Sequence, residues 1–138
     1  SVKGRTYQYF EGQPLYEFGY GLSYTKFRYK SKGVNVEQDT VKVSFEVSNT
    51  GKYDGDEVAQ VYVKYPETGT YMPLKQLHGF KRVHIKKGKT SKVTIGVPKK
   101  DLRYWDEQER KFVTPKGEYT FMVGASSEDI KFRETVGL

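Results

Sequence analysis

His78 and His84 are the two histidines of the chain and the first candidates for metal binding or proton transfer. They lie six residues apart in a strand-like stretch, so they share a face only if no β-bulge separates them, and Gly79 favours a bulge. Two histidines without neighbouring carboxylates make a poor zinc site. The absence of cysteine excludes thiolate ligands, disulfides and thiol nucleophiles. We therefore expect neither a bound metal nor a cofactor.

Two groups of carboxylates could bind calcium or act as an acid and base pair. Asp54, Asp56 and Glu57 follow a turn, but their spacing does not match an EF-hand loop, and hydrogen bonds within the turn are their more ordinary use. The carboxylates of residues 106–109 lie in a charged turn with no apolar neighbour that would raise the pKa of one of them. No glycine-rich loop precedes a helix to bind phosphate. We expect no catalytic residue.

Exposed aromatic rings can stack on sugars, which makes Trp105 and Tyr62 candidate carbohydrate contacts. Trp105 is the only tryptophan, and Tyr62 lies on the outward face of an expected strand. A tryptophan between Leu102 and a polar turn more often covers the core of a sandwich. We favour this structural role for Trp105 and keep carbohydrate binding as the alternative.

The net charge of +7 is concentrated in one stretch. Residues 81–100 hold eight of the 24 Lys and Arg and none of the 17 Asp and Glu. Apolar residues alternate with these cations, whereas nucleic-acid-binding surfaces interleave exposed aromatics. The favoured interpretation is a pair of strands whose outward lysines protect a sheet edge. An anion-binding surface is the alternative, and no nucleic-acid partner is expected.

A series of short strands must position these side chains. Val41, Val43, Phe45 and Val47 alternate with polar residues, which indicates a half-buried strand. Turn residues recur about every ten positions. Further strands are expected at 58–65, 74–85, 92–97, 111–113, 119–123 and 130–135. Seven or eight strands without a helical face predict an all-β, two-sheet antiparallel sandwich.

The first 22 residues differ from the rest. Nine of the chain's aromatic residues lie between Tyr7 and Tyr29, among glycines and a proline that break regular structure. We expect an irregular segment over 1–22 that places its rings on another domain, followed by the sandwich over 23–138. A disordered tail is the alternative. The candidate interdomain contacts are Tyr7, Tyr9, Phe10, Tyr16, Phe18 and Tyr20.

Several motifs resemble one family when taken together and in order. Residues 5–25, RTYQYFEGQPLYEFGYGLSYT, resemble the passage that leads into the C-terminal domain of glycoside hydrolase family 3 enzymes. NTG at 49–51, GDEVAQVYV at 55–63, LHGFKRV at 77–83 and GEYTFMVG at 117–124 are similar to that domain's signature. One departure is Glu17, where many members have proline.

The resemblance implies an immunoglobulin-like, fibronectin type III-like sandwich without catalytic residues. It implies a parent β-glucosidase or β-xylosidase whose reactive residues lie in other domains, and residues 5–12 are closer to the β-xylosidase type. The expected partners are the catalytic domains of the same chain, with polysaccharide as a further candidate. We expect a secreted or periplasmic parent, with a cytoplasmic one as the alternative. No apolar run is long enough to predict a membrane span.

Overall fold

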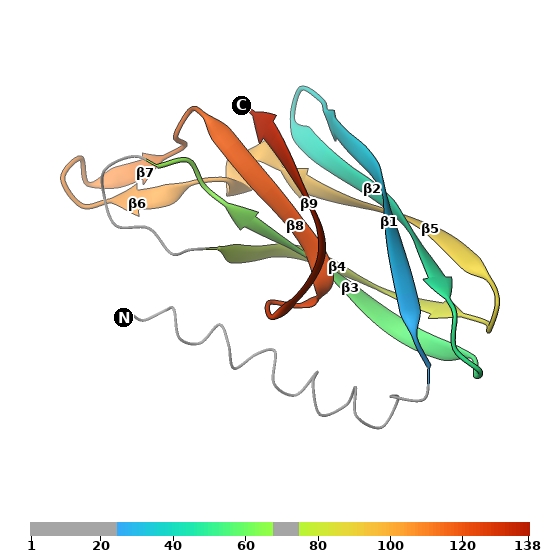
Figure 1. Ribbon diagram of the computed structural model, residues 1–138. Helices are drawn as coiled ribbons and strands as arrows, with labels where there is room; N and C mark the ends of the chain where they lie inside the picture. Colours follow the sequence, from blue (N-terminus) through green and yellow to red (C-terminus); the bar gives the residue numbers. More distant parts are fainter. Residues whose placement is uncertain (1–24, 68–74) are drawn as a thin grey trace.

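The computed structural model describes residues 25–67 and 75–138, which form strands and one short 3₁₀ turn (Figure 1). The elements, in chain order, are β1 (Phe27–Val36), β2 (Thr40–Asn49), β3 (Gly55–Lys64), β4 (Gln76–Ile85), β5 (Thr90–Pro98), η1 (Lys99–Asp101), β6 (Tyr104–Asp106), β7 (Lys111–Val113), β8 (Glu118–Ser126) and β9 (Asp129–Gly137). The predicted boundary between residues 22 and 23 lies outside the described residues. None of the described residues form a helix long and apolar enough to cross a membrane.

The strands form two antiparallel sheets packed face to face, with a separate hairpin. One sheet has the order β1-β2-β5 and the other β4-β3-β8-β9, while β6 and β7 pair with each other beside the sandwich (Figure 1). The predicted all-β sandwich is confirmed. Seven strands build the two sheets, and the short β6–β7 pair accounts for the two further strands of the described chain.

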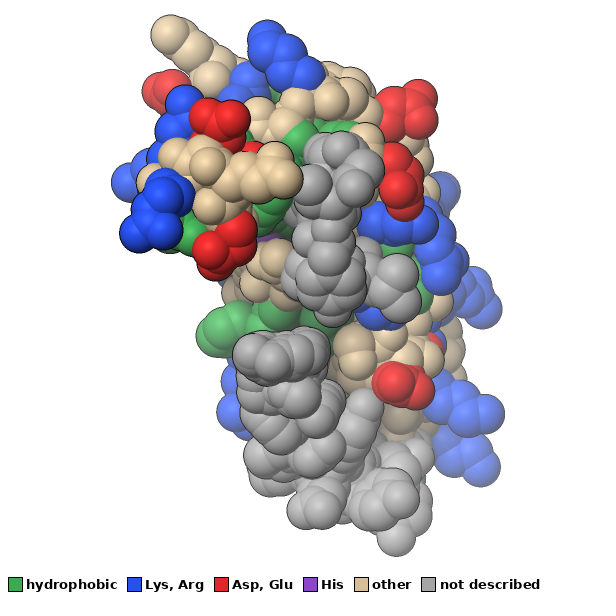
Figure 2. All heavy atoms as spheres, turned by 90° about the vertical axis from the view of Figure 1, so that its left-hand side faces the viewer, with side chains coloured by type: hydrophobic (Ala, Val, Ile, Leu, Met, Phe, Trp, Pro, Cys, Tyr) green, Lys and Arg blue, Asp and Glu red, His purple; other side chains and the backbone are tan. Residues whose placement is uncertain are grey.

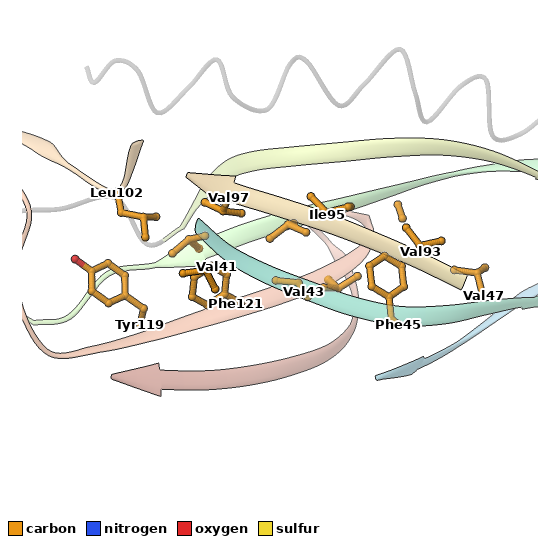
Figure 3. Close-up of a cluster of buried hydrophobic side chains, with 14 of the residues drawn as sticks. Val41, Val43, Phe45, Val47, Val93, Ile95, Val97, Leu102, Tyr119 and Phe121 are labelled. Carbon is orange, nitrogen blue, oxygen red and sulfur yellow. The ribbon is translucent and has the colours of Figure 1, made fainter. Parts of the chain in front are cut away.

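The core lies between the inner faces of the two sheets. On β2 the residues Val41, Val43, Phe45 and Val47 are at most 1% exposed, as their alternation predicts. The inner residues of β5 lie beside them in the same sheet, and those of β3 and β8 meet them across the sandwich (Figure 3). The ring of Phe45 lies 5.8 Å from those of both Tyr29 on β1 and Phe132 on β9. Three aromatic rings from both sheets therefore fill one end of the core.

Tyr119 anchors the other end of the core. Its side chain is completely buried near the start of β8, and its hydroxyl donates a hydrogen bond to the carbonyl oxygen of Pro115. Such a tyrosine corner is a recurring feature of immunoglobulin-like sandwiches. The ring also lies 5.5 Å from that of Tyr65, which is 6% exposed.

Asn49 holds the β2–β3 turn, as the NTG motif predicts. Its side-chain Nδ2 donates to the carbonyl oxygens of Tyr53 and Ile85, both at 2.8 Å, and its Oδ1 accepts from the backbone N–H of Gly51. A Cβ at Gly51 would lie 2.6 Å from the backbone nitrogen of Lys26, so the close approach of the two chains requires glycine. The turn therefore ties β1, β2 and the end of β4 together.

Candidate functional site

A bulge in β4 determines which side chains reach the outer face of the four-stranded sheet. Gly79 pairs with Val61 of β3, but the next pair joins Leu77 to Tyr62, which leaves His78 as the extra residue. The irregularity expected at Gly79 is therefore present. Since paired residues of antiparallel strands point to the same face, Leu77 and Phe80 both point outward although they are three residues apart.

Apolar side chains form a surface on the outer face of the β4-β3-β8-β9 sheet, the face opposite the core. We call Tyr62, Leu77, Phe80 and Met122 the outer apolar patch; Tyr62 pairs with both Leu77 and Met122 in neighbouring strands. Leu77 is 47% exposed and Phe80 is 67% exposed, whereas Tyr62 and Met122 are each 8% exposed. Sequence reasoning missed Leu77, Phe80 and Met122. The bulge expected at Gly79 could have revealed Leu77 and Phe80, because the extra residue exchanges the inward and outward positions of β4 on one side of it.

Polar groups anchor the buried part of this patch. The hydroxyl of Tyr62 donates to Gln60 Oε1 at 2.5 Å, and Gln60 Nε2 donates to the carbonyl oxygen of Ala125 at 2.9 Å. Lys75 Nζ lies 5.9 Å from the centre of the Tyr62 ring and donates to the carbonyl oxygen of Ser127. Burial lowers the pKa of Lys75. Tyr62 lies on the predicted outward face, but little of its ring is open to a sugar in this structure.

Cations surround the outer apolar patch. Lys64, Arg82 and Arg133 point outward on β3, β4 and β9, since they pair with Thr120, Val58 and Met122 respectively. The described strands place Asp56 and Glu118 on the same face, but Asp56 already accepts hydrogen bonds from Arg82 at 2.7 Å and lies 2.5 Å from His84 Nδ1. Those two contacts, with His84 first, lower the pKa of Asp56.

The two histidines lie in different surroundings, as a bulge between them requires. His78 Nε2 lies 3.0 Å from the hydroxyl of Tyr65 at the end of the core, and burial lowers the pKa of His78. His84 points outward to Asp56. Within residues 25–67 and 75–138, no three His, Cys, Asp or Glu side chains come together in a way that could hold a metal ion.

The carboxylates near the β2–β3 turn also separate. Asp54 Oδ1 accepts from the backbone N–H of Lys87 at 2.9 Å and so joins two turns. Glu57 accepts a hydrogen bond from the hydroxyl of Tyr29 at 2.7 Å, and burial raises the pKa of Glu57 and that of Tyr29. Asp56 points to the outer face instead. Three carboxylates that are close in sequence therefore accept hydrogen bonds from three different parts of the chain.

The β6–β7 hairpin carries a second exposed aromatic group. Trp105 pairs with Phe112, and their rings lie 5.2 Å apart in an edge-to-face arrangement. The guanidinium carbon of Arg103 lies 4.3 Å from the centre of the Phe112 ring. Asp106 Oδ1 accepts hydrogen bonds from two backbone N–H groups of the turn, those of Gln108 and Glu109. Trp105 is 46% exposed, so it does not cover the core as we favoured from the sequence. Charged side chains of both signs lie at this end of the molecule (Figure 2).

The basic stretch 81–100 lies along β4 and β5, which are edge strands of the two sheets. Ile85, Val93, Ile95 and Val97 are buried, while most of the cations between them are exposed. The favoured interpretation, outward cations on strand edges, agrees with this placement. The aromatic residues predicted as interdomain contacts, from Tyr7 to Tyr20, lie outside the described residues.

Comparison with known proteins identifies relatives of the whole described sandwich. A family model named "Fibronectin type III-like domain" matches residues 57–127. A probable beta-glucosidase D of Emericella nidulans is 39% identical over 91% of this chain and 18% of its own length. A xylan 1,4-beta-xylosidase of Xylanibacter ruminicola is 40% identical over 94% of this chain and 15% of its own length.

Solved structures give the same result. A beta-glucosidase of Kluyveromyces marxianus superposes with a TM-score of 0.79 at 35% identity, over 83% of this chain and 14% of its own. Beta-glucosidase 3B of Thermotoga neapolitana gives a TM-score of 0.78 at 33% identity, over 83% of this chain and 16% of its own. The chain thus spans about a fifth or less of the length of these relatives.

Proposed function

The chain belongs to the fibronectin type III-like domain family, and from this premise we propose that it is a non-catalytic accessory module of a larger glycoside hydrolase of family 3. In this proposal the module packs on the catalytic domains of the same parent chain and stabilises them. The carrying observation is the match to one domain-sized part of long relatives named as beta-glucosidases and a xylosidase. The parent's substrates would accordingly be β-linked glucosides or xylosides.

The geometry of the titratable groups supports a role without chemistry. Catalysis of glycoside hydrolysis needs two carboxyl groups that face one bond across a short gap. In the described residues, the carboxylates of Asp54, Asp56 and Glu57 point to three different partners. Asp106 holds the backbone of its own turn. The reactive residues are therefore assigned to other domains of the parent.

Hydrolysis assays test this proposal. The isolated chain is expected to hydrolyse neither 4-nitrophenyl β-glucoside nor the β-xyloside, while the full-length product of its gene hydrolyses at least one. The parent is proposed to be secreted or periplasmic, so that the activity is expected outside the cytoplasm. Turnover by the purified isolated chain, or a full-length product without glycosidase activity, would contradict the proposal.

A second candidate function is carbohydrate binding by the β6–β7 hairpin. The observation that favours it is the exposure of Trp105 and Phe112, whose rings lie outside the core cluster. Affinity electrophoresis of the isolated chain in xylan, arabinoxylan and β-glucan tests it. Retardation that Trp105→Ala abolishes and Val36→Ala preserves would support it. Unretarded migration of the wild type in all three gels would dispose of it.

A further inference from the structure

We propose that the outer apolar patch, Tyr62, Leu77, Phe80 and Met122, is the surface through which the module docks onto a neighbouring domain of its parent chain. The proposed docking surface on that domain is apolar at its centre and carries carboxylates at its rim. This inference rests on the proposed function and adds to it the face that makes the contact.

The two outer faces of the sandwich differ in a way that an unpartnered module does not require. The outer face of the β1-β2-β5 sheet is polar, and Ser44 and Ser48 on β2 bond to Thr94 and Thr90 on β5 at 3.1 and 2.7 Å. Its outward side chains include Arg28, Lys30, Lys42, Ser44, Glu46, Ser48, Lys92 and Thr94. The other sheet presents the apolar patch instead. Apolar patches rimmed by polar residues mark interaction sites, and aromatic residues, Met and Arg are enriched in interfaces.

The bulge at His78 has a specific consequence for this surface. Without the extra residue, Leu77 and Phe80 would point to opposite faces of β4 because their separation is odd. With it, both point outward beside Tyr62, while Gly79 points inward toward Ile95. Bulges often re-aim side chains at functional positions. The bulge thus assembles the exposed half of the patch.

Charge selects the occupant. Lys64, Arg82 and Arg133 point outward around the patch, and Lys75 lies against the Tyr62 ring. The described strands place two carboxylates on this face: Asp56, whose charge and that of Arg82 offset each other, and Glu118 at the start of β8. The excess positive charge is therefore that of Lys64, Lys75 and Arg133. A surface with carboxylates at its rim complements this distribution and excludes partners of the same sign.

The same charges disfavour two other occupants. A second copy of the chain would bring one basic rim against another, which is repulsive. The chain's own first 24 residues carry Lys3 and Arg5 against Glu11 and Glu17, so that segment is neutral. A domain tethered to this chain is present at a high effective concentration, so its contact does not have to overcome the entropy cost of free association. The proposal requires that this domain carries the acidic rim.

The test titrates the isolated chain into the full-length gene product from which residues 1–138 have been removed. Phe80→Asp is expected to weaken binding by about tenfold or more, because it replaces the most exposed aromatic side chain of the patch by a charge, and a few such aromatic residues carry most of the binding energy of an interface. Val36→Asp replaces another exposed apolar residue on an edge strand, β1, and serves as the matched control with unchanged affinity. Arg133→Glu is expected to weaken binding, and most strongly at low ionic strength, where charges are least screened. Lys42→Glu, on the outer face of the other sheet, is expected to leave the affinity unchanged.

Calorimetry of the intact full-length protein gives a second readout if the shortened protein does not fold. The wild type and Val36→Asp are expected to unfold with the module coupled to the other domains, and Phe80→Asp with a separate, earlier transition of the module. Equal behaviour of Phe80→Asp and Val36→Asp in a protein that does hydrolyse β-glycosides overturns the patch while leaving the proposed function standing. If the full-length wild type has no glycosidase activity, the proposed function is overturned instead.

Two results with the isolated chain would also overturn the assignment. A dimer in sedimentation that Phe80→Asp dissociates would make a second copy the occupant. A destabilisation by Phe80→Asp that disappears when residues 1–22 are deleted would make the N-terminal segment the occupant. The proposal expects a monomer whose urea midpoint Phe80→Asp changes no more than Val36→Asp does.

Discussion

Replacing Gly79 by alanine tests the bulge that orients Leu77 and Phe80. A methyl group at position 79 would lie 2.9 Å from Ile95 Cγ2, about 1 Å closer than the optimum for two carbon atoms. Ile95 is 6% exposed, and its β-branched side chain is stiff at χ1, so that this methyl group does not turn aside easily. Overpacking of this kind costs about 1–3 kcal/mol. We expect Gly79→Ala to lower the free energy of unfolding by that amount.

A double-mutant cycle with Ile95→Ala isolates the contact. Ile95→Ala alone is expected to cost about 2–5 kcal/mol because it leaves a cavity. In that background Gly79→Ala places its methyl group in the cavity, so the two effects are not additive and the coupling reaches about 1–3 kcal/mol. The assay is urea unfolding followed by far-UV circular dichroism. The buffer contains sulfate, which stabilises folded proteins, so that even the least stable variant is folded before urea is added. Gly137→Ala, where the added Cβ meets nothing within 4 Å, is the control.

Additivity within about 0.5 kcal/mol would refute this reasoning. It would mean that residue 79 does not face Ile95 across the sandwich. The register of β4 beyond the bulge would then be different, and Leu77 and Phe80 would not share the outer face.

Two further predictions concern groups inside the sandwich. Tyr119→Phe removes the hydrogen bond to the Pro115 carbonyl and is expected to cost about 1–2 kcal/mol, measured as a lower urea midpoint with an unchanged slope; an unchanged midpoint would deny the tyrosine corner any energetic role. Burial raises the pKa of Glu57 in the folded protein above its value of about 4.3 in the unfolded chain. The contribution of Glu57 to stability is therefore full below about pH 4.3 and is lost as the pH rises through the pKa of the folded protein. Glu57→Gln keeps an acceptor for Tyr29 but does not ionise, so thermal unfolding of this variant is expected to lose that decline above about pH 4; a decline as steep as that of the wild type would assign it to another group.

Alternation in the sequence was sufficient to predict the inner faces of the sandwich. Val41 to Val47 are buried every second residue because β2 is central in its sheet and has one face on the core. β1 was marked only by a change of period after Tyr24, since its apolar residues are sparser and a bulge at Gly33, with φ of 103°, interrupts them.

The outer surfaces were less predictable because they depend on register between strands. Tyr62 was predicted to point outward, and it does, but it is only 8% exposed, and Gln60 and Lys75 are among its contacts. Trp105 was assigned to the core lid because Leu102 is close in sequence. Leu102 is indeed completely buried, but the hairpin that begins at Tyr104 turns Trp105 toward Phe112 and away from the core. Local sequence does not encode that change of direction.

Amide hydrogen exchange compares the isolated chain with the full-length gene product and so addresses docking without any substitution. If the module packs on the catalytic domains through the outer apolar patch, peptides that span Leu77–Phe80 and Met122 exchange more slowly in the full-length protein, while those of β1 and β5 exchange alike in both. Identical exchange across β4 and β8 in the two proteins would contradict the account.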